Sequence, residues 1–153
     1  MNMEIIKKYK VLLILALVVI VSIFFFFYRF YHNDVKALED FLASYEKFDK
    51  AILDFSISKN DDLESKAGDA FIKLNIKATF RISSLIKNDA ELMDKAREIA
   101  DLSGKELESL RAYKRAIQSK NTGLDGLAKE YGDLTNKRKT AYARFRELAE
   151  LKN

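Results

Sequence analysis

This 153-residue chain is poor in histidine and cysteine, two residue types that commonly serve as catalytic groups or metal ligands. It has a single histidine, His32, and no cysteine, which excludes a thiol nucleophile, a disulfide and a thiolate metal site. Metal sites in helical bundles use Glu-x-x-His motifs on facing helices, and one histidine cannot supply two of them. The sequence also lacks a glycine-rich phosphate loop and a Gly-x-Ser-x-Gly motif. We therefore expect a protein that is not an enzyme, with no catalytic residue, cofactor or metal site.

The one acidic cluster consists of Asp61, Asp62 and Glu64 and has two interpretations. It could be a cation site, or it could be the first turn of a helix. Asn60 or Asp61 can cap the free N–H groups of a helix, and carboxylates in the first turn are favoured by the helix dipole. We favour the helix start.

An apolar run without a charged residue extends from Val11 to Tyr28. As a helix, its eighteen residues would span about 27 Å, close to the ~30 Å hydrocarbon core of a bilayer. A cleaved signal peptide would end in small residues, whereas this run ends in phenylalanines and a tyrosine. We expect an uncleaved transmembrane anchor over residues 11–31, in contact with the lipid bilayer. The residues that mark it are Val11, Leu12, Leu13, Ile14, Leu15, Phe24, Phe25, Phe26, Phe27 and Tyr28.

Basic residues on either side of the run indicate its orientation. Three lysines precede it within the first ten residues, whereas Arg29 and Lys36 are the first cations among those that follow. By the positive-inside rule, residues 1–10 stay in the cytoplasm and residues 32–153 form an extracytoplasmic domain, either periplasmic or at the cell surface. The chain is then a single-pass protein of the cell envelope.

The rest of the chain favours helices throughout. It contains no proline, and apolar residues recur at steps of three and four between turn signals. We expect an all-α fold in which the transmembrane helix continues into an antiparallel, coiled-coil-like four-helix bundle. An open pair of helical hairpins is the alternative. The predicted helices cover about residues 33–57, 61–87, 89–119 and 124–151.

The second of these helices carries apolar residues on two faces. Its main stripe runs from Leu63 to Leu85, and a second row consists of Ile72, Ile76 and Phe80. A helix that is apolar on two faces is either central in the bundle or presents one face to a partner. The pattern favours neither interpretation. We take the second row as the candidate interface for another protein or for self-association.

The third helix has a shift in its apolar stripe near Ser103 and Gly104. This shift predicts either one kinked helix or two shorter helices. We favour one kinked helix, because a glycine in a helix interior costs only ~1 kcal/mol and packing can offset that cost.

The last helix has the most regular pattern, a heptad repeat from Leu124 to Leu148. Arg138 interrupts this seam as its polar position. Its long side chain can reach outward, pair with a carboxylate on a facing helix, or set the register of the helices. We favour a position at the edge of the seam.

Charges of both signs alternate along the chain, with a formal net charge of +4. Part of the excess lies before the apolar run, so we expect no nucleic-acid partner. The pattern favours a membrane-anchored helical interaction or scaffold protein. The alternative is a sensory or small-ligand-binding bundle that acts through a partner, because the architecture resembles, in fold alone, the four-helix sensor domains of chemoreceptors. A phage spanin-like envelope protein is a minor alternative, suggested by a short N-terminal anchor followed by helices.

Overall fold

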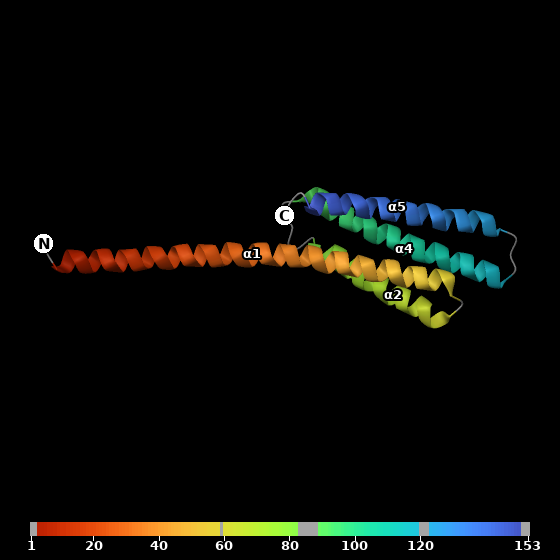
Figure 1. Cartoon of the computed structure of the whole chain (residues 1–153), viewed down its shortest axis with the longest axis horizontal. Coiled ribbons are helices and arrows are strands. Elements are labelled where there is room, and N and C mark those ends of the chain that lie inside the picture. The colour runs from red at the N-terminus through yellow and green to blue at the C-terminus, as the bar shows by residue number, and fades with distance from the viewer. Residues whose placement is uncertain (1–2, 59, 83–88, 120–122, 151–153) are drawn as a thin grey trace. The chain divides into compact units, whose positions relative to one another are not determined.

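The chain is helical throughout the part that its computed structural model describes, residues 3–58, 60–82, 89–119 and 123–150. No strand occurs in these ranges, so the all-α prediction is confirmed. The elements, shown in Figure 1, are α1 (Met3–Ile57), α2 (Asp61–Ile76), the π-helix η1 (Lys77–Ile82), α4 (Ala90–Gln118) and α5 (Leu124–Glu150).

The chain divides into two compact units, one up to Lys36 and one from Ala37 onward. In the first unit, large apolar side chains of α1 are exposed: Leu17, Val18, Val19, Ile20, Val21, Ile23, Phe24, Phe25, Phe26 and Tyr28. Within the described residues, no helix is both long and apolar enough to cross a membrane. The transmembrane segment expected over residues 11–31 is therefore not confirmed.

In the second unit, the later part of α1 packs with α2, η1, α4 and α5 as a helical bundle around one core (Figure 1). Aromatic rings join α1 to two of its neighbours. The ring centroids of Phe41 and Phe145 are 4.7 Å apart, and those of Phe48 and Phe71 are 6.3 Å apart. Apolar stripes spaced by three and four residues account for this core, because such spacing puts side chains on one helix face.

The ends of α2 show how the chain turns into and out of this helix. The Asn60 side chain caps α2 by accepting a hydrogen bond of 3.0 Å from the backbone N–H of Asp62. The acidic cluster thus lies at a capped helix start, where carboxylates are favoured. At its other end the α-helix stops at Ile76 and the chain continues as η1 to Ile82, whereas the predicted helix ran to residue 87. Residues 83–88 lie outside the described part.

α4 is one helix that passes through Gly104, so the alternative of two shorter helices is wrong. A Cβ atom at this position would lie 3.0 Å from the Cζ atom of Phe71 on α2. The glycine therefore lets the Phe71 ring approach the α4 backbone closely. The stripe does not break here, because Ser103 and Glu106 occupy the next buried positions of the helix.

Candidate functional site

The most unusual feature of the interior is a charged cluster that joins three helices. Arg138 on α5 is 1 % exposed, and Glu106 on α4 is fully buried. The Arg138 Nε atom donates a hydrogen bond to Glu106 Oε2, and its Nη2 atom lies 2.7 Å from Oδ1 of Asp49 on α1. Thr135 Oγ1 donates a second hydrogen bond, 2.7 Å long, to the Glu106 carboxylate. Each carboxylate thus meets the guanidinium from a different helix.

Aromatic rings enclose this cluster. The guanidinium carbon of Arg138 lies 5.0 Å from the ring centroid of Tyr45 and 5.3 Å from that of Phe48, within the range of cation–π attraction. Tyr45 in turn stacks on Tyr142 with a centroid distance of 3.6 Å. Burial opposes the charge on Arg138, but the hydrogen bond and negative charge of Glu106 outweigh it and raise the pKa of Arg138. The guanidinium therefore stays charged in the interior.

The position of Arg138 corrects the edge position that the sequence favoured. The side chain lies inside the bundle and pairs with carboxylates on facing helices. The apolar pattern of the third helix did not indicate that Glu106 is buried, because the stripe was followed through apolar residues alone. A signal was present: the steps of four and three that begin at Leu92 continue unbroken if polar residues are counted, through Ala96, Ile99, Ser103, Glu106 and Leu110.

The candidate interface row is exposed on the bundle. Ile72 and Ile76 on α2 are 54 % and 48 % exposed, and Phe80 on η1 is 69 % exposed. Their neighbours Leu74 and Ala78 belong to the opposite face and are buried in the core. The two apolar faces of this segment therefore have different surroundings, one within the bundle and one in contact with solvent.

The residues expected to anchor the chain all lie in α1. Side chains of residues 11–15 and of Phe27 fall outside the described part. Phe24, Phe25, Phe26 and Tyr28 are each at least 65 % exposed.

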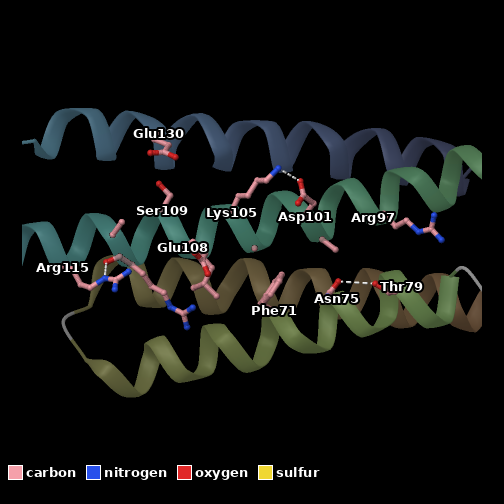
Figure 2. A pocket seen from close by; sticks show the side chains of 15 residues that line it. Phe71, Asn75, Thr79, Arg97, Asp101, Lys105, Glu108, Ser109, Arg115 and Glu130 are labelled. Carbon is pink, nitrogen blue, oxygen red and sulfur yellow. Dashed lines mark hydrogen bonds and ion pairs between the residues drawn. The ribbon is translucent and has the colours of Figure 1, made fainter.

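A groove of about 800 Å³ runs along α4 (Figure 2). Two of its cations pair with carboxylates on the same helix: Lys105 Nζ lies 2.6 Å from Asp101 Oδ2, and Arg97 Nη1 lies 4.0 Å from Asp94 Oδ1. Ser109 points toward α5 near Glu130, as Figure 2 shows. The lining charges Arg97, Asp101 and Lys105 are spread along α4, and Glu130 lines the groove from α5.

Comparison of the chain with known protein families, with curated proteins and with solved structures found no match. In the described ranges, no group of three or more His, Asp or Glu side chains could hold a metal ion. The described surfaces of the chain that bear on its function are the exposed row and the exposed apolar side chains of α1.

Replacing Arg138 by methionine should lower the free energy of unfolding by about 3–5 kcal/mol, because Glu106 would stay buried without its cation. Urea unfolding of the full chain at pH 7 in a nonionic detergent would measure the loss. Adding Glu106→Leu should recover most of it, since the buried charge is then removed. The matched control Arg146→Met breaks an exposed pair with Glu150 and should cost less than about 1 kcal/mol. A double variant as unstable as the sum of the two single variants would contradict this account.

Stability should also fall at alkaline pH. Burial raises the pKa of Tyr45, Tyr131 and Tyr142 in the folded chain above the ordinary value of about 10. The unfolded chain therefore loses these protons first, so the free energy of unfolding is fully retained below about pH 10 and decreases above it. Urea titrations between pH 9 and pH 12 would test this, with Tyr45→Phe as the comparison. The variant should show a shallower decrease, and an unchanged slope would count against the burial argument.

Proposed function

We propose that this chain is a non-enzymatic interaction or scaffold protein of the cell envelope, anchored in the membrane by its N-terminal helix. The observation that carries the proposal is the exposed row of Ile72, Ile76 and Phe80. The opposite face of the same segment, α2 and η1, is buried in the core of the bundle. Exposed apolar patches of this kind are typical of surfaces that bind proteins. The partner is a helical protein of the same compartment or a second copy of the chain.

The energy available from the row is enough to support association. Burying a large apolar side chain fully is worth about 1.5–3 kcal/mol relative to leaving it exposed. The three side chains are roughly half to two thirds exposed, so covering them adds about 1–2 kcal/mol each. Each 1.4 kcal/mol changes a dissociation constant about tenfold, so these side chains could act as anchors of an interface.

The proposed membrane anchor draws its support from the sequence. Eighteen consecutive residues from Val11 to Tyr28 carry no charge, and Phe30 and Tyr31 follow at the position of an aromatic belt. Side chains of this run are described from Ala16 to Phe26 and at Tyr28, so its full length is a property of the sequence. The lysines before the run favour a cytoplasmic N-terminus and an extracytoplasmic bundle.

Replacing Ile72, Ile76 and Phe80 together by serine should weaken association at least tenfold, because the apolar contact area is lost. Light scattering on the purified full chain would measure self-association, and pull-down from native membranes would measure partner binding. A control replaces Leu53, an exposed apolar residue outside the row, by serine and should leave association unchanged. The interface assignment is wrong if the row variant keeps the circular dichroism spectrum and every association of the unmodified chain.

The topology can be tested with single cysteines, because the chain has none of its own. A cysteine replacing the exposed Ser65 should react with a membrane-impermeant maleimide added from outside the inner membrane. A cysteine replacing Asn2 should react only after the membrane is opened. If only the cysteine at position 2 reacts before the membrane is opened, the topology is the opposite of the one proposed. Release of the chain by alkaline carbonate would exclude a membrane span.

A further inference from the structure

A second cleft lies at the end of the bundle where α1 ends, α2 begins and α4 ends. Its volume is about 730 Å³, within the range of about 300–1,000 Å³ that is common for small-molecule sites. The packing of α5 is also looser toward this end. Leu127 and Leu134 in its first half are only partly buried, whereas Phe145 in its second half is fully buried.

One part of the cleft is apolar and incompletely covered. Phe55 and Tyr113 pack against the core, but Ile57 is 79 % exposed and Ile117 is 44 % exposed. Large aliphatic side chains that line a cavity and remain in contact with water gain free energy when an apolar group covers them. This part of the cleft therefore suits the apolar body of a ligand.

The other part of the cleft is cationic. Arg111, Lys114 and Arg115 come from neighbouring positions on α4 and all line the cavity. Arg111 is neutralised, since its Nε atom lies 2.8 Å from Glu64 Oε1. Lys114 and Arg115 then share the cleft with a single further carboxylate, Glu108. The cavity lining thus keeps an excess of positive charge after its internal ion pair is counted.

Lys114 is held in place before any ligand arrives. Its Nζ atom donates a hydrogen bond to the backbone carbonyl of Ser58 and lies 4.4 Å from the ring centroid of Phe55. An ammonium group can donate three hydrogen bonds, so two remain for other acceptors. Partial burial lowers the pKa of Lys114, which an anionic group beside it would reverse. A preorganised cation next to an apolar wall favours a ligand that has a negative end and an apolar body.

We propose that this cleft binds a small organic carboxylate, with the carboxylate between Lys114 and Arg115 and the apolar body against Ile57 and Ile117. Charge-assisted hydrogen bonds from these cations fix the orientation of the ligand, while the apolar contact supplies affinity. A bound molecule would touch both the end of α1 and the last turns of α4. The site uses neither the row at Ile72, Ile76 and Phe80 nor the N-terminal anchor, so it is independent of the scaffold function.

Calorimetry on the full chain in phosphatidylcholine nanodiscs tests the proposal, with empty nanodiscs as the blank. The probes are three carboxylates, 2-naphthoate, 4-phenylbutyrate and octanoate, and two naphthoate analogues, 2-naphthylmethanol and 2-naphthylmethylammonium. At least one carboxylate should bind, and naphthoate should bind at least tenfold more tightly than its neutral and cationic analogues. No binding by any of the three carboxylates overturns the proposal, as does equal binding of the cationic analogue.

Variants of the chain locate the binding. Combined Lys114→Gln and Arg115→Gln should weaken carboxylate binding at least tenfold, whereas the exposed control Lys139→Gln should leave it unchanged. If the double variant loses its helical circular dichroism, Arg115→Gln alone replaces it, because this side chain is exposed. Unchanged binding in a folded charge variant overturns the proposal. The serine variant of the row should bind carboxylates normally, so a failed ligand site and a failed scaffold interface give different results.

Discussion

A buried guanidinium constrains the register of three helices of the bundle, α1, α4 and α5. The charged side chain of Arg138 can be buried because Glu106 on α4 and Asp49 on α1 pair with it there. Removing a charge from water without such partners costs several kcal/mol, and sliding one helix by a turn, about 5.4 Å, would separate the groups. Apolar stripes alone penalise such a slip less, since one layer of aliphatic side chains resembles the next. We infer that the charged cluster selects one arrangement of α1, α4 and α5.

Apolar side chains that are exposed outside this core gain free energy when another molecule removes them from water. In the second unit, the faces of α2 and η1 that point inward are covered by the bundle, whereas Ile72, Ile76 and Phe80 are left outside it. In the first unit, the described large apolar side chains of α1, which lie between Leu17 and Tyr28, are exposed. Under the proposed function, a protein covers the row and lipid covers the N-terminal helix. In this proposal, the burial of apolar surface accounts both for protein binding by the second unit and for lipid binding by the first.

The proposed ligand site depends on how the core changes along its length. Near Arg138 and Phe145 the interior is filled by charged pairs and aromatic rings. At the end where α1 and α4 stop, the lining includes the exposed Ile57 and the cations of the last turns of α4. Loose packing at the end of a bundle leaves room for a ligand without an empty cavity in the core, where a void would be costly.

The sequence by itself determined the all-α class, the helix stripes and a cap at Asn60 or Asp61, because these depend on spacing and on neighbours a few residues away. The structure assigns the cap to Asn60. The sequence also placed Arg138 within the heptad repeat of the last helix. Only the tertiary structure decided that Arg138 is buried, because this depends on Glu106 and Asp49, which lie 32 and 89 residues away in the chain. It likewise decided which face of α2 stays exposed, since local periodicity identifies an apolar face but does not say which other helix covers it.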